Sequence, residues 1–194
     1  MLVPKQKYDH CAVTLAAVLG SIPFGDPAED PNLMMGPIVN RKQRDRIVNM
    51  IKQAAKDGAT IACGGDIGPQ QKGFYVQPTL LTNVKPGSMI EQEEVFGPVL
   101  CLIPYEDEED AIRIANDTRY GLAGSVHSAT NERAFRVAHR IRTGNLGING
   151  GTFYGADAPF GGYKESGVGL EMGKEGFEEY LASKTVGYNS SLPK

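Results

Sequence analysis

The stretch EEVFGPVL (residues 93–100) sets two carboxylates beside an aromatic ring, just before a Gly-Pro break and an apolar run. The two oxygens of a carboxylate can accept hydrogen bonds from two neighbouring sugar hydroxyls. The ring of Phe96, two residues after Glu94, can flank a flat heteroaromatic group. A solvated acid pair at the entrance of an ordinary strand fits the same composition. Both interpretations stay open at this level.

A glycine-rich segment, residues 151–173, is the next place where chemistry is conceivable. The dinucleotide fingerprint G-x-G-x-x-G needs a preceding strand and a following helix, and GVGLEMG (residues 167–173) misses its spacing by one residue. The Walker pattern is absent as well. We therefore expect a structural loop, in which glycines permit tight turns and close approach.

The three cysteines and three histidines show no spacing typical of a nucleophile or a metal site. Cys11 lies in an apolar helical pattern and Cys101 in the apolar strand VLCLIP, where a buried thiol is inert. We expect packing or surface roles, no catalytic residue and no metal site. The residues concerned are Cys11, Cys63, Cys101, His10, His127 and His139.

Helical and strand patterns alternate along the chain, which predicts an α/β fold: a mostly parallel, twisted sheet with flanking helices. Asn40 has the residue type of a helix N-cap, and Pro98 to Tyr105 is apolar enough for a strand buried on both faces. The predicted helices cover residues 7–22, 40–58, 107–121 and 131–144, and the segment 175–188 is predicted to be a helix that runs into a β-prone end. The predicted strands cover residues 60–63, 75–80, 98–105, 122–128 and 145–149.

Charge and composition exclude several classes of partner. The formal net charge of -3 gives no electrostatic support for binding a phosphate backbone, so no nucleic-acid partner is expected. No apolar run approaches the ~20 residues of a membrane span. Three scattered cysteines favour a reducing compartment, so we expect a cytoplasmic protein without a membrane partner.

Taken together, four motifs resemble the C-terminal portion of the NAD(P)-dependent aldehyde dehydrogenases, and their order and spacing extend that resemblance over nearly the whole chain. The motifs are GFYVQPTLLTNV (73–84), EEVFGPVL (93–100), NDTRYGLAGSVHS (116–128) and PFGGYKESGVG (159–169). The resemblance implies a partial catalytic domain over residues 1–174. It also implies a C-terminal helix and oligomerisation strand over residues 175–194.

The resemblance also implies site residues. Glu94 is expected to bind the ribose hydroxyls next to the nicotinamide of NAD or NADP, and Phe96 to lie near the nicotinamide ring. Phe153 and Tyr154 are expected to form one wall of the aldehyde tunnel. The segments 131–144 and 183–188 resemble elements that contact a second subunit, the latter by adding a strand to it.

Other parts of the family's mechanism have no counterpart among these residues. The nucleophilic cysteine of the family lies in a G-Q-x-C stretch, which the resemblance places before Met1, as it does the base glutamate and the dinucleotide-binding domain. We therefore expect the chain alone to be inactive, since covalent catalysis without its nucleophile loses several orders of magnitude. Several alternatives remain: a truncated gene product, a misplaced start, one piece of a split enzyme, a non-catalytic association module that pairs with a full-length or N-terminal partner, and a decayed fragment. The expected partner is a second copy of the chain in a homo-oligomer or a chain that supplies the N-terminal half.

Overall fold

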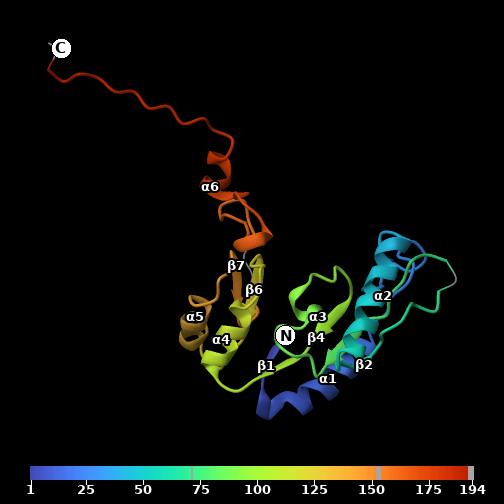
Figure 1. Ribbon diagram of the computed structural model, residues 1–194. Helices are drawn as coiled ribbons and strands as arrows, with labels where there is room; N and C mark the ends of the chain where they lie inside the picture. The colour runs from blue at the N-terminus through green and yellow to red at the C-terminus, as the bar shows by residue number, and fades with distance from the viewer. Residues whose placement is uncertain (71, 152–153, 192–194) are drawn as a thin grey trace. The chain divides into compact units, whose positions relative to one another are not determined.

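The computed structural model describes residues 1–70, 72–151 and 154–191 and divides the chain into two compact units, Met1–Thr118 and Arg119–Lys194 (Figure 1). This division differs from the expected one after residue 174, which stays a prediction. In the part of the chain that the structure describes, no helix is long and apolar enough to cross a membrane.

The first unit contains most of the regular structure. Its helices are η1 (Lys5–Lys7), α1 (Tyr8–Gly20), α2 (Arg41–Lys56), α3 (Met89–Gln92) and α4 (Glu108–Asn116). Its strands are β1 (Leu2–Pro4), β2 (Thr60–Cys63), β3 (Thr79–Thr82), β4 (Val99–Cys101) and β5 (Ile103–Tyr105). The strands β1 and β5 pair in parallel, as do β3 and β4, whereas β2 is antiparallel to β3.

The second unit is smaller and contains more irregular structure. Its elements are β6 (Ala123–Val126), α5 (Asn131–Ala138), β7 (Asn145–Ile148), η2 (Lys164–Ser166) and α6 (Gly173–Glu178). The strands β6 and β7 pair in parallel across the α5 connection. Together the two units confirm the predicted α/β class with largely parallel pairing.

The core of the first unit has two sides, separated by β3. Leu81 packs in a cluster with Ile47 and Ile51 of α2, whereas Leu80 packs with apolar residues of α1. Successive side chains of a strand point to opposite faces, so this one strand supports both helices. All four residues of β3 are buried, as expected for a strand covered on both faces.

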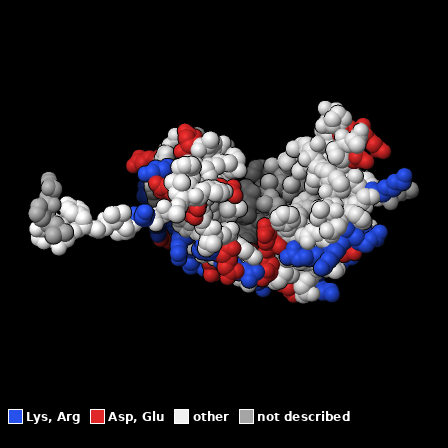
Figure 2. Space-filling view, turned by 90° about the horizontal axis from the view of Figure 1, so that it is seen from above, with Lys and Arg blue, Asp and Glu red and all other residues white. Residues whose placement is uncertain are grey.

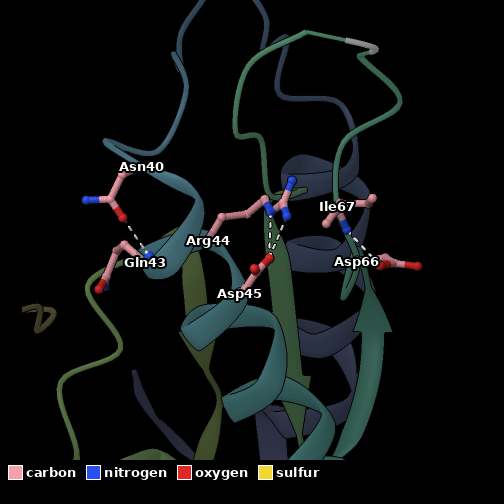
Figure 3. Close-up of polar contacts among 6 residues, drawn as sticks. All are labelled: Asn40, Gln43, Arg44, Asp45, Asp66 and Ile67. Atoms are coloured by element: carbon pink, nitrogen blue, oxygen red, sulfur yellow. Dashed lines mark hydrogen bonds and ion pairs between the residues drawn. The ribbon is translucent and has the colours of Figure 1, made fainter.

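Helix α2 begins where the sequence predicts. The side-chain oxygen of Asn40 accepts a hydrogen bond from the backbone N–H of Gln43 at 2.9 Å, which satisfies a donor of the first turn (Figure 3). Ile47, Ile51 and Ala54 lie on one buried face, at the spacing of successive helical turns.

Several predicted elements differ from the observed ones. The strand expected over residues 75–80, with a break at Pro78, is regular only from Thr79 and extends to Thr82, because Pro78 has no N–H to donate to a neighbouring strand. The strand expected over residues 98–105 is interrupted at Leu102, where the pairing partner changes from β3 to β1.

The last two predicted helices are shorter than expected. Helix α5 ends at Ala138, where the chain tightens into i→i+3 bonds such as Arg140 N–H to the Val137 carbonyl. Helix α6 ends at Glu178, and residues 179–191 contain no helix or strand. The sequence analysis also missed β1 and α3, which are only 3 and 4 residues long and too short for a periodic pattern.

Candidate functional site

The segment Glu94–Gly97 follows α3 and leads into β4, and it lines a cleft of about 590 Å³ in the first unit. Both predicted cofactor residues, Glu94 and Phe96, belong to the lining, together with the acids Glu91 and Glu93. The cleft therefore combines negative charge with an aromatic surface. The structure places Glu94 and Phe96 in the lining of the same cleft, and their role in binding a cofactor stays a prediction.

The carboxylate of Glu94 is exposed toward solvent. Within the described residues, it makes no hydrogen bond or ion pair with another side chain. Its two oxygens are therefore open to donors from a bound molecule, such as a pair of vicinal hydroxyls. Glu91 differs, because its side chain accepts hydrogen bonds from the backbone of Gly87 and from Gln92.

Phe96 has an unusual backbone and an exposed ring. Its φ is 53°, in the left-handed region that costs a non-glycine residue about 1–3 kcal/mol. The side chain is 71% exposed, so burial of the ring does not offset this cost. Backbone strain of this kind persists only where the surroundings hold the segment in place.

Helix α2 supplies polar contacts that hold this segment. The guanidinium of Arg46 donates to the carbonyl oxygens of Glu94 and Val95, both at 2.9 Å. The side-chain amide of Gln43 donates to the carbonyl oxygens of Val95 and Phe96 at 3.3 and 3.4 Å. Three consecutive carbonyls are thus anchored to one face of the helix.

Gly97 brings the backbone into close contact with the same helix. A Cβ atom at position 97 would lie 2.6 Å from Cδ1 of Ile47, which is fully buried. A glycine is therefore required for this approach, even though the backbone at position 97 is not left-handed. The next residue, Pro98, accepts a hydrogen bond from the Thr79 N–H at 2.8 Å and so aligns the segment with β3.

The sequence analysis missed Gln43 and Arg46. They lie about fifty residues before the segment that they hold, and a periodic pattern does not reveal a polar contact over that separation. The sequence could show only that both residues lie near Ile47, beside the apolar face of the predicted helix.

The predicted aldehyde-tunnel residues belong to the second unit. Phe153 lies outside the described residues. The side chain of Tyr154 is 68% exposed, and its ring meets that of Phe160 edge-on, with the centroids 5.2 Å apart. Phe160 is fixed by two backbone hydrogen bonds with Glu171. Tyr154 therefore presents a supported aromatic surface to solvent.

The glycine-rich segment of the second unit is shaped by close backbone packing. A Cβ at Gly144 would lie 1.8 Å from the carbonyl oxygen of Gly161, and a Cβ at Gly161 would lie 2.5 Å from a methyl group of Leu170. These contacts are those of the structural loop that the sequence predicted.

The three thiols are half-buried packing groups. Burial raises the pKa of the Cys101 thiol; the N-terminal ammonium group opposes this effect and the negative charge of Glu91 adds to it. Cys11 packs against the core through α1, and the thiol of Cys63 faces the Pro78 carbonyl at 3.8 Å. Among the described residues, no group of three His, Cys, Asp or Glu side chains is arranged to hold a metal ion.

Charge is mixed over the surface. On the face that Figure 2 displays, Lys and Arg are interspersed with Asp and Glu. Lys and Arg also gather in one contiguous patch on that face, at the lower right of the view.

Comparison with known proteins gives a consistent result. The sequence profile of the aldehyde dehydrogenase family matches residues 1–186. A 3-succinoylsemialdehyde-pyridine dehydrogenase from a Pseudomonas species is 44% identical over 195 residues, covering 98% of this chain and 40% of that protein. A betaine aldehyde dehydrogenase from Brucella anthropi is 41% identical over 168 residues, covering 85% of this chain and 34% of that protein.

Solved structures resemble this chain at a similar level of sequence identity. The betaine aldehyde dehydrogenase of Staphylococcus aureus, in complex with NAD+, has a TM-score of 0.90 at 39% identity, covering 100% of this chain and 40% of that chain. An aldehyde dehydrogenase of Mycobacterium tuberculosis, complexed with NAD+, has a TM-score of 0.88 at 42% identity, covering 92% and 37%. The chain thus spans at most 40% of the length of these relatives.

The close approach at Gly97 yields a testable expectation. Gly97→Ala should lower the free energy of unfolding by about 1–3 kcal/mol, because the new methyl group overlaps Ile47 in a filled core. Ile47→Val in the same chain should recover part of that loss, since it removes the nearest carbon atom. Urea unfolding of the two single variants and the double variant measures the coupling between the two positions. Strict additivity of the two losses would contradict the contact.

Proposed function

We infer the function of this chain from the aldehyde dehydrogenase family, to which it belongs. We propose that it is the C-terminal part of an enzyme that oxidises an aldehyde to a carboxylic acid with NAD or NADP. The observation that carries the proposal is the cleft lined by both the exposed ring of Phe96 and Glu94, whose carboxylate has no side-chain partner among the described residues.

The residues of this cleft fit the nicotinamide half of the cofactor. The Glu94 carboxylate can accept hydrogen bonds from both hydroxyls of the ribose, and Phe96 offers a flat apolar surface for the ring. When bound, the oxidised nicotinamide accepts a hydride and carries a positive charge, which the acids Glu91, Glu93 and Glu94 favour. The solved structures with NAD+ support this proposal, because they are related over the whole chain.

The aldehyde is proposed to contact the second unit. The exposed ring of Tyr154, held edge-on by Phe160, suits a wall that packs against the carbon skeleton of an aldehyde. Phe153 is proposed for the same wall, from the resemblance alone. In this assignment the two units have separate tasks, cofactor binding and substrate packing.

The 194 residues are proposed to be inactive without further protein. A thioester intermediate needs a reactive thiolate, and the three thiols present are half-buried among apolar or carbonyl neighbours. Burial also raises the pKa of Cys101, so its thiol is less ionised at neutral pH than an ordinary cysteine. The nucleophile is then supplied by another part of the enzyme or by a partner chain.

A second proposed role is association. The segment 183–190 has no strand of its own, and Val186 and Tyr188 are 78% and 88% exposed. An extended segment with exposed apolar side chains can add a strand to the sheet of another subunit. The partner is a second copy of the chain or a chain that carries the remaining parts of the enzyme.

The proposed cofactor site is tested with oxidised nicotinamide mononucleotide, which contains the ring, the ribose and one phosphate. Glu94→Gln should weaken its binding to the chain about tenfold, because the amide replaces charge-assisted acceptors. Chemical-shift titration of the labelled chain measures the affinity, and Glu29→Gln, an exposed acid in a loop away from the cleft, is the charge-matched control. Equal affinities for both variants and the unchanged chain would contradict the assignment.

The proposed inactivity is tested by adding NAD+ and a panel of aldehydes to the purified chain. Absorbance at the reduced-nicotinamide band should stay at the level of the buffer, because the three thiols present are half-buried packing groups. Turnover proportional to the concentration of the chain would refute the proposal.

The proposed association is tested by sedimentation of the chain and of two point variants. Val186→Asp should shift the population toward monomers, because a charge in a paired strand is costly to desolvate. Asn189→Asp introduces the same charge three residues later at a position that is already polar, and it should have a smaller effect. A chain that is monomeric at every concentration, with or without a partner carrying G-Q-x-C, would exclude this role.

A further inference from the structure

We propose that Arg46 is a positioning residue for the nicotinamide site, acting through the backbone of Glu94–Phe96. The inference rests on the function proposed above for Glu94 and Phe96. Arg46 itself is absent from the lining of the cleft, and it contacts the segment through the carbonyl oxygens of Glu94 and Val95.

The geometry of the contact is that of a two-pronged clamp. One terminal nitrogen of the guanidinium donates to the Val95 carbonyl and the other to the Glu94 carbonyl, both at 2.9 Å. Two bonds from one rigid planar group fix the orientation of the peptide units as well as their distance from α2. The peptide bond between Glu94 and Val95 is therefore held directly by α2.

This clamp accounts for the left-handed backbone of Phe96. Phe96, whose φ is 53°, follows directly after the two residues whose carbonyls Arg46 binds. The next residue, Gly97, packs closely against the buried Ile47. The bonds from Gln43, at 3.3 and 3.4 Å, are longer and come from a neutral amide, so they contribute less. Among the side-chain bonds from α2 to this segment, Arg46 thus supplies the shorter, charge-assisted pair.

The exposed Glu94 side chain needs such a restraint. Within the described residues, no other side chain bonds to its carboxylate, so its direction depends on the backbone that carries it. A carboxylate that must meet two hydroxyls at once tolerates little displacement, since binding energy is lost when the group has to be ordered at the moment of binding. Arg46 therefore keeps Glu94 preorganised.

Lysine is not equivalent at position 46. Its ammonium group is a single point charge on a flexible stem, so it can reach one carbonyl but lacks the planar fork that matches two. Arg46→Lys should consequently keep the charge and recover only part of the restraint. Arg46→Lys therefore distinguishes two effects of Arg46: the orientation of the two carbonyls by the planar guanidinium, and a general effect of positive charge beside an acidic cleft.

The experiment uses the full 194-residue chain labelled with 15N, with the variants Arg46→Ala, Arg46→Lys and Glu94→Gln. Lys52→Ala is the control, because it removes one positive charge from the exposed side of the same helix. Backbone order parameters of residues 94–97 are measured without ligand, and the affinity for oxidised nicotinamide mononucleotide is measured by titration. Amide exchange of the buried strand β3 checks that each variant remains folded.

In the unchanged chain and in Lys52→Ala, residues 94–97 should have order parameters near ~0.85, the value of a rigid backbone. In Arg46→Ala they should fall below ~0.6, and the affinity for the mononucleotide should drop about tenfold, with β3 protected as before. Arg46→Lys should give intermediate values for both quantities.

Two other outcomes overturn the inference for different reasons. If Glu94→Gln weakens binding while Arg46→Ala leaves both the order parameters and the affinity unchanged, Arg46 does not position the site and the proposed function stands. If neither Glu94→Gln nor Arg46→Ala changes the affinity, the proposed cofactor site itself is wrong, and the inference falls with it.

Discussion

The close approach of the segment Glu94–Gly97 to helix α2 is the constraint on which the rest of the first unit depends. It combines a steric part, a glycine against the buried Ile47, with a polar part, carbonyl oxygens held by Arg46 and Gln43. Helix α2 is itself anchored by its apolar face against Leu81 of β3. The segment is thus fixed to the core of the unit through α2 and, at Pro98, through β3.

This construction explains why a strained and exposed aromatic residue is maintained. Phe96 gains little from burial, so its left-handed backbone is maintained by the bonds around it. Two kinds of interaction offset the cost of this left-handed backbone: the charge-assisted hydrogen bonds from Arg46 and the packing of Gly97 against the filled core. Binding sites commonly combine such local strain with rigid support, so that a ligand meets groups that are already oriented.

Much of this architecture was predictable from sequence, because it depends on local patterns. The N-cap at Asn40, the buried face at Ile47 and Ile51, and the strand Thr60–Cys63 all follow from nearby residue types. Glu94 and Phe96 were predicted as cofactor residues from their chemistry and the family resemblance, and both line one cleft, while their role stays a prediction.

The remaining features depend on contacts between distant parts of the chain. Two departures from the predicted elements result from tertiary pairing and loop geometry: the interruption of the strand at Leu102 and the early end of α5. The clamp formed by Arg46 joins residues about fifty positions apart, and one sequence contains no local signal for such a pair. Polar residues that act on a backbone carbonyl are therefore the part of a site that sequence reasoning misses most readily.

The central claim is that Glu94 and Phe96 face the nicotinamide and its ribose. Nuclear Overhauser effects between the labelled chain and oxidised nicotinamide mononucleotide test it most directly. The account predicts cross-peaks from the ring protons of Phe96 to the nicotinamide protons, and from the side-chain methylenes of Glu94 to the ribose protons. Cross-peaks confined to the glycine-rich segment of the second unit, with none from Glu94 or Phe96, would contradict it.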